Sequence, residues 1–175
     1  TIPFSKHIVA HNMNVGLLMI FAFASSGSMA LLFAGWSSRN KYAMMSAVRS
    51  VSQAVAYEIP MLITAITIVM MTGTLDLMEI VNQQGPSFLH WNVFPVFANS
   101  HNLLMPISFL IFFTCTLAET NRAPFDLGEA ESELVAGFHT EYGSMGFGLF
   151  FMAEYANIVI GACLTTILFL GGWHP

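Results

Sequence analysis

The sequence predicts an all-α integral membrane protein that crosses the bilayer several times. Of its 175 residues, 55% are hydrophobic and only 9% are charged, whereas soluble domains carry about a quarter charged residues. Apolar stretches with few charges recur along the chain, and a membrane helix needs about 20 such residues. Soluble helices of this length would show a charged face, and these do not. Five Lys and Arg residues are too few for a nucleic-acid-binding surface, so this function class is excluded.

Four segments have the length and composition of membrane spans. The first contains no charged residue and is followed by Trp36, an aromatic side chain suited to the membrane interface. The second has Arg49 at its start and Glu58 about one third along it. The third is a short apolar core, and the only charge in the fourth is Glu154. We expect these spans at residues 13–35, 48–72, 100–118 and 144–170.

The three connections differ in length and polarity. Residues 37–47 form a short connection, and residues 119–143 form the most polar stretch of the chain. Residues 73–101 are long, and their aromatic content predicts a short interfacial helix around residues 88–97, with Trp91 among the lipid headgroups.

Basic residues predict the orientation. In a four-span topology the first and third connections lie on one side, which holds Arg39, Lys41 and Arg122, with Arg49 just inside a helix. The other side holds only Lys6. Because short loops rich in Lys and Arg face the cytoplasm, the acidic third connection is predicted to face the cytoplasm or the mitochondrial matrix.

Ten acidic residues in so apolar a chain require an explanation. Six of them lie in residues 119–143, and Glu58 and Glu154 lie inside predicted spans. A charge at the middle of a bilayer costs about 3 kcal/mol, so such residues by default face a wet cavity and mark a proton or ion path. The alternative for Glu58 is a side chain that reaches the membrane surface or caps a kink near Pro60. For the loop acids the alternative is a solvated surface.

The acidic loop has the features of a proton relay. Glu129 and Glu133 are four residues apart and would share a helix face, with Glu131 between them. Like charges this close repel one another, which favours shared protons. Pro124 and Gly128 predict irregular backbone, which is tolerated near a bilayer where it lines a cavity or meets a partner.

A polar stripe opens the second span. Arg49, Gln53 and Tyr57 follow at four-residue spacing, so they share one helix face, which we expect to contact protein or a cavity. No metal or nucleophile motif accompanies it, because the two cysteines lie in apolar runs without ligand spacing. Among six histidines only His139, beside Glu141, is a candidate for proton transfer.

Five motifs, in order along the chain, carry a family resemblance. They are GWSSRNKY at 35–42, SQAVAYE at 52–58, AETNRAPFDL at 118–127, EAESELVAGFHTEY at 129–142 and FFMAEYAN at 150–157. Together they resemble the quinone-site membrane subunit of proton-pumping NADH:quinone oxidoreductase, respiratory complex I. That subunit has about eight membrane helices, and this chain resembles its middle part. Together with the first residue, Thr1, this predicts a piece of a longer chain or a split gene product.

The resemblance implies a place where the membrane arm meets the peripheral redox arm, with the acidic loop helping to form a quinone cavity. The residues that match the quinone cavity are Arg49, Glu119, Arg122, Asp126, Glu131 and Glu133. The residues that match a proton path from that cavity are Glu58, Glu129, Glu131, Glu133, Glu141 and Glu154.

The resemblance also implies cofactors, partners and location. This chain would bind no cofactor or metal and supply no catalytic residue, with quinone as substrate and with FMN and iron–sulfur clusters in partner subunits. Its partners would be the other membrane-arm and peripheral-arm subunits and the lipid bilayer, with no nucleic acid. The location would be the bacterial plasma membrane or the mitochondrial inner membrane.

Three other functions remain open at this point. The membrane subunit of an energy-converting hydrogenase resembles the same family but lacks a quinone step, and the run from Thr120 to Asp126 favours complex I over it. An ion transporter would use Glu58 and Glu154 as ligands, but the chain shows no internal repeat. A structural anchor for peripheral subunits would not need these two glutamates.

Overall fold

The described part of the chain is helical throughout, which confirms the predicted all-α class. Among these residues no strand is present. The structure is a computed structural model, and it describes residues 2–5, 8–9, 11–87, 90–94, 104–121, 124–125 and 137–174. The elements are α1 (Gly16–Ser37), α2 (Lys41–Thr72), α3 (Leu77–Gln83), α4 (Met105–Glu119), the 3-10 turn η2 (Gly137–His139) and α6 (Ser144–Phe169).

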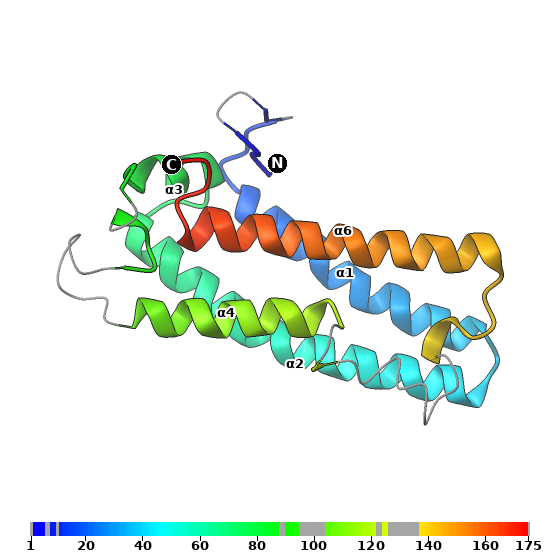
Figure 1. Ribbon diagram of the computed structural model, residues 1–175. Helices are drawn as coiled ribbons and strands as arrows, with labels where there is room; N and C mark the ends of the chain where they lie inside the picture. The colour runs from blue at the N-terminus through cyan, green and yellow to red at the C-terminus, as the bar shows by residue number, and fades with distance from the viewer. Residues whose placement is uncertain are drawn as a thin grey trace.

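The four longer helices form one elongated bundle (Figure 1). α1 packs on α2, α2 packs on α4, and α4 packs on α6. The short helix α3 lies at one end of the bundle, close to both chain ends, and η2 lies at the opposite end. This arrangement gives the bundle two ends with different packing.

Three helices are long and apolar enough to cross a membrane, which agrees with a polytopic membrane protein. They are α1, α2 and α6, with 22, 32 and 26 residues. α4 is apolar but has only 15 residues in the described part, and residues 100–103 of the predicted third span lie outside it. α4 as a fourth span therefore stays a prediction.

α2 begins seven residues before the predicted span at residue 48, because Asn40 caps it. The Asn40 side chain accepts a hydrogen bond from the backbone N–H of Tyr42 at 3.0 Å. At 1.5 Å per residue, the 32 residues of α2 extend about 48 Å, well beyond an apolar bilayer core of about 30 Å. The basic first turns of α2 can therefore lie outside the hydrocarbon.

The short helix of the second connection lies earlier than predicted. It is α3 at Leu77–Gln83, and Asp76 caps it by accepting a hydrogen bond from Met78 N at 2.9 Å. Residues 90–94 form turns, and Trp91 is half-buried with its indole against Gly171. The prediction of a helix with Trp91 among the headgroups is therefore wrong for residues 90–94, while residues 88–89 and 95–97 lie outside the described part.

The tightest packing is at the α3 end of the bundle. Side chains from the start of α1, the end of α2, α3, α4 and the end of α6 form one apolar cluster. Its members that are fully buried include Ile68, Leu77, Ile80, Phe112, Leu168 and Phe169.

Gln84 holds the end of α6 in this cluster. Its side chain is 2% exposed, its Nε2 donates to the carbonyl oxygen of Ile167 at 2.8 Å, and its Oε1 accepts from Gly171 N at 2.9 Å. Because the last carbonyls of a helix have no partner within the helix, this amide stabilises the terminus.

Candidate functional site

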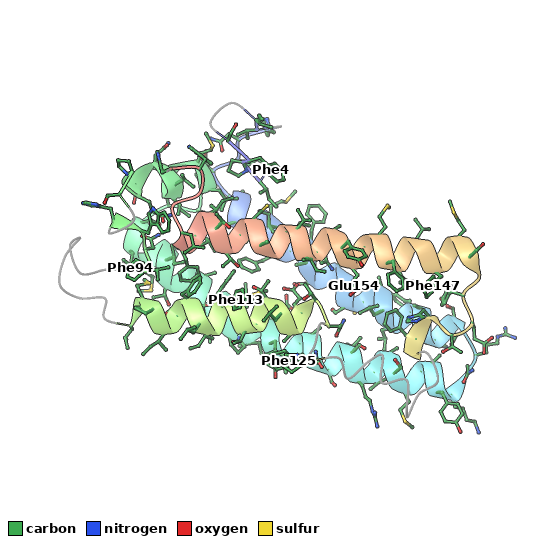
Figure 2. All side chains as sticks on the ribbon, in the orientation of Figure 1. Phe4, Phe94, Phe113, Phe125, Phe147 and Glu154 are labelled. Carbon is green, nitrogen blue, oxygen red and sulfur yellow. The ribbon has the colours of Figure 1, made fainter. Side chains whose placement is uncertain are left out.

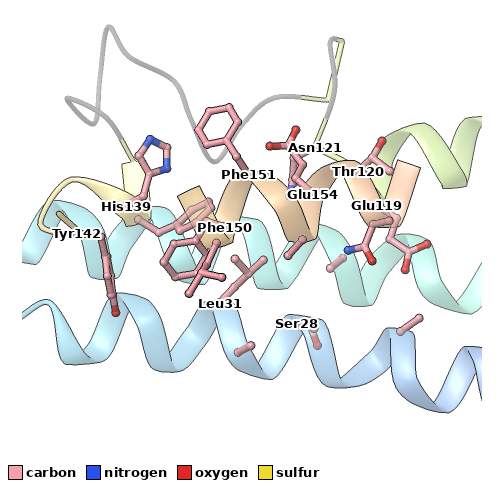
Figure 3. Close-up of a pocket in the computed structure, with 18 of the residues that line it drawn as sticks. Ser28, Leu31, Glu119, Thr120, Asn121, His139, Tyr142, Phe150, Phe151 and Glu154 are labelled. Carbon is pink, nitrogen blue, oxygen red and sulfur yellow. The ribbon is translucent and has the colours of Figure 1, made fainter. Parts of the chain in front are cut away.

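A cavity of about 450 Å³ occupies the middle and the η2 end of the bundle (Figure 3). Its walls come from α1, α2, the end of α4, η2 and the first half of α6. His139 and Tyr142 lie toward one end of it, and Glu119 and Thr120 lie toward the other. Residues distant in the sequence therefore meet at one polar space inside the bundle.

Three carboxylates from three helices line this cavity. They are Glu58 of α2, Glu119 at the last position of α4 and Glu154 of α6. Sequence analysis assigned all three to the site but could not show that they share one space. Their convergence supplies what an intramembrane charge requires, a polar surrounding instead of lipid.

Glu58 is bound by the neighbouring helix. Its carboxylate accepts a hydrogen bond from the hydroxyl of Ser25 on α1, and the Ser25 hydroxyl also lies 3.1 Å from the carbonyl oxygen of Phe21. Glu58 is half-buried, and Pro60 lies two residues further along the same continuous helix. Glu58 therefore faces the bundle interior at this position.

The η2 end of the cavity is held to the corner between α1 and α2. The Tyr142 hydroxyl lies 3.1 Å from the carbonyl oxygen of Ala34 and 2.7 Å from the Ser37 hydroxyl. Next to it, Glu141 accepts a hydrogen bond from Asn40 Nδ2 at 2.8 Å. Glu141, predicted for the proton path, is exposed and does not line the cavity in the described part of the chain.

His139 lines the cavity at the same end. It is half-buried, and its ring lies edge-on to those of Phe138 and Phe147, with centroids 5.1 and 5.2 Å away. Burial lowers the pKa of His139, and the nearby Glu154 carboxylate acts in the opposite direction. The imidazole is thus close to a carboxylate and outside the long helices.

The chain leaves α4 through a turn that α2 holds in place. Asn121 has a positive φ of 49°, and its backbone N–H lies 3.3 Å from the carbonyl oxygen of Ala118. Asn is among the few residues that adopt this conformation at a helix end without large strain. The same carbonyl accepts a hydrogen bond from Gln53 Nε2 at 2.9 Å. The polar stripe predicted on α2 faces protein at Gln53.

Arg49 lies in a different place from the one predicted. It does not line the cavity with the carboxylates but a separate groove of about 670 Å³ at the corner between α1 and α2. Trp36, Arg39 and Lys41 line the same groove. The other predicted site residues fall outside the described residues; they are Arg122, Asp126, Glu129, Glu131 and Glu133.

Sequence analysis missed several polar residues of the cavity. Asn157 of α6 lines it and follows Glu154 by three residues, so helical spacing could have identified it. Thr120 and Asn121 belong to the AETNRAPFDL run, and Tyr142 ends another motif, but the sequence alone gave no reason to single them out.

An apolar cavity of about 370 Å³ adjoins the first one toward the packed end of the bundle. Its walls include Phe21, Met61 and Leu164, and it shares Glu119 and Asn157 with the polar cavity. The carboxyl group and the amide therefore stand where the interior changes from polar to apolar. Among the described residues no three His, Cys, Asp or Glu side chains could hold a metal ion, so the site offers proton-accepting and hydrogen-bonding groups.

Comparisons with known proteins give a consistent set of relatives. A family model described as NADH dehydrogenase matches residues 1–175. The chain is 73% identical over 173 residues to a membrane-family relative from Desulfotalea psychrophila that is named as a subunit of NADH-quinone oxidoreductase, covering 99% of this chain and 52% of that protein. It is 46% identical over 174 residues to the protein of the same name from Rhodospirillum centenum, covering 99% and 48%. It is 45% identical over 172 residues to the NADH-ubiquinone oxidoreductase chain 1 of Metridium senile, covering 98% and 48%. The chain thus spans about half the length of these curated relatives.

Proposed function

Because the chain belongs to the NADH dehydrogenase family, we propose that it is the part of a membrane subunit of NADH:quinone oxidoreductase that links quinone reduction to proton movement. The family resemblance and the multi-pass membrane class expected from the sequence are confirmed by these matches and by the three long apolar helices. The observation that carries the proposal is the convergence of Glu58, Glu119 and Glu154 on one cavity.

The chemistry follows from charge in a medium of low dielectric. Reduction of a quinone to a quinol takes up two electrons and two protons, so each turnover changes the proton demand at the reaction site. A carboxylate in a membrane interior exchanges protons with its neighbours because ionisation there costs several kcal/mol without compensation. Glu58, Glu119 and Glu154 then form the part of a proton path that this chain supplies.

The two ends of the cavity have different proposed roles. Glu119 and the turn after it begin the segment that contains Arg122, Asp126, Glu131 and Glu133, which we assign to the quinone side. Glu129, Glu131, Glu133 and Glu141 would carry protons between this side and the buried carboxylates. Arg49, in the groove at the α1–α2 corner, would contribute positive charge from a neighbouring surface rather than from the cavity wall.

The electron carriers are assigned to partner subunits. An iron–sulfur cluster of a peripheral subunit would deliver electrons to the quinone, and the FMN would lie further along the same arm. This chain would shape the quinone side and handle protons. The three relatives are all named as parts of NADH oxidoreductases, which favours this function over a hydrogenase subunit, a transporter or an anchor.

The test uses the whole assembled complex. Glu58→Gln, Glu119→Gln and Glu154→Gln remove an ionisable group with little change in size, and each should lower both quinone reductase activity and protons pumped per NADH oxidised. We expect a loss of about tenfold or more, the size of effect ascribed to acid–base groups. Glu79→Gln on α3 is the matched control, because Glu79 lies on a helix away from the cavity.

NADH oxidation by an artificial acceptor that is reduced ahead of the quinone should stay unchanged in all four variants. If the three cavity variants assemble and pump with the same stoichiometry and rate as Glu79→Gln, the proton role is wrong.

A further inference from the structure

We propose that Gln53 and Tyr57 of α2 are positioning residues, which fix the segment leaving α4 and thereby the place of Glu119 at the cavity. This inference rests on the proposed function of that cavity. Neither residue lines the cavity, so both would act through the segment they hold.

Gln53 clamps two backbone carbonyls on either side of the turn. Its side chain is 7% exposed, and its Nε2 donates to the carbonyl oxygen of Ala118 at 2.9 Å and to that of Phe125 at 2.7 Å. A side-chain amide has two N–H donors, so these two bonds use the whole donor capacity. One side chain thereby fixes both ends of an eight-residue segment, residues 118–125.

Tyr57 holds the far end of this segment through its ring. It lies four residues after Gln53 and therefore on the same face of α2. The rings of Tyr57 and Phe125 meet edge to face, with centroids 5.3 Å apart and an angle of 64° (Figure 2 shows Phe125 beside α2). Phe125 is thus held at its backbone carbonyl and at its ring by neighbouring residues of one helix.

The held segment includes the residues that form the cavity wall. Glu119, Thr120 and Asn121 line the cavity and follow Ala118 directly. Thr120 is 5% exposed, and Asn121 takes the left-handed conformation that turns the chain. Movement of either anchor would therefore move Glu119 relative to the carboxylates on α2 and α6.

The contacts distinguish positioning from ordinary packing. An apolar core residue would fill the same space, but only a group with two donors can bind two carbonyls at once. Gln53 Oε1 is buried and has no hydrogen-bond partner among the described residues, so the amide is present for its donors. Loss of these donors should disturb geometry, and a misplacement of about 1 Å can cost about a hundredfold in rate.

Gln53→Met is the main test variant, because it keeps the length of the side chain and removes both donors. In the assembled complex we expect kcat/KM for a short-chain quinone to fall about tenfold, with a changed pH profile and an unchanged rate with an artificial acceptor. Gln53→Asn keeps an amide on a shorter stem and should recover part of the loss. Tyr57→Leu leaves both hydrogen bonds in place and should give a smaller fall.

Gln84→Met is the matched control. Gln84 is an equally buried amide that binds the end of α6, far from the carboxylates. Its variant should reduce the amount of assembled complex without changing kcat/KM or the pH profile per assembled complex. The two glutamines thus separate loss of stability from loss of positioning.

An assembled Gln53→Met complex with kcat/KM and pH profile equal to those of the unaltered complex would overturn the inference. If Gln53→Met does not assemble, Tyr57→Leu decides, and an unchanged kcat/KM in that variant is the contrary result. Loss of activity in the Glu58, Glu119 and Glu154 variants with normal Gln53 and Tyr57 variants would refute the positioning role alone. Full activity in the glutamate variants would refute the proposed function itself.

Discussion

α4 and α6 approach most closely where Gly161 faces Thr116, and this contact gives a quantitative prediction. A Cβ placed on Gly161 would lie 2.4 Å from Thr116 Cγ2, about 1 Å closer than ordinary van der Waals contact. Thr116 is 9% exposed and its hydroxyl is bound to the carbonyl oxygen of Phe112, so it cannot turn away freely. Small residues at such crossings let membrane helices pack closely.

Gly161→Ala should therefore destabilise the protein. Forcing a methyl group into a packed site costs about 1–3 kcal/mol, and Ala recovers up to about 1 kcal/mol of helix propensity over Gly. The net loss is about 1–2 kcal/mol, and each kcal/mol lowers the melting midpoint of a chain of this size by about 2–4 °C. Gly148→Ala is the matched control on the same helix, because nothing lies within 4 Å of a Cβ at Gly148.

The cause can be isolated by a second substitution. Thr116→Ser removes Cγ2 and keeps the hydroxyl, so it should restore most of the stability that Gly161→Ala removes. Thermal unfolding of the purified complex, or of the isolated chain in detergent, would give the four midpoints of this double-mutant cycle. If the two substitutions are additive, or if Gly161→Ala melts with Gly148→Ala, the contact does not limit the approach of these helices.

Two further predictions concern the η2 end of the cavity. Because burial lowers the pKa of His139, the unfolded chain binds the proton first; the stability from neutral His139 is complete above pH 6.5 and is lost as the pH falls through the folded-state pKa. His139→Gln should melt with less sensitivity to acid between about pH 7 and pH 5, and an unchanged pH dependence would contradict this. Asn40→Ala removes the α2 cap and the Glu141 partner and should cost about 1 kcal/mol in melting experiments. Asn40→Asp keeps a capping oxygen but repels Glu141, so stability equal to that of Asn40→Ala would show that the cap contributes little.

The sequence predicted the helical class because the relevant signal is local. Runs of apolar residues fix the three long helices within a few residues, and the acid content of those runs identified Glu58 and Glu154. The ends were less predictable, since a cap depends on a single side chain. Asn40 extends α2 well ahead of the apolar run, and Asp76 starts α3 in a connection where aromatic content suggested a helix further on.

The arrangement of the site needed tertiary structure. Nothing local in the sequence places Glu119 in the same space as Glu58 and Glu154, because the three lie on separate helices. The stripe on α2 indicated that one face meets protein, yet it did not distinguish Gln53, which holds two carbonyls, from Arg49, which lies in another groove. Side-chain direction, which depends on how the helices cross, decides between these outcomes.

Residue size explains why the cavity lies where it does. Along α1, the residues beside the carboxylates are small, among them Ala24, Gly27 and Ser28, whereas Ile20 and Phe21 one turn earlier fill the packed end. α6 shows the same change from glycine and alanine in its first half to large aliphatic and aromatic residues at its end. Space has therefore been left where three helices carry acids and removed where none does. A bundle that used its acids only for solubility would have no reason to keep small residues opposite them, so the paired distribution of size and charge favours a working polar interior.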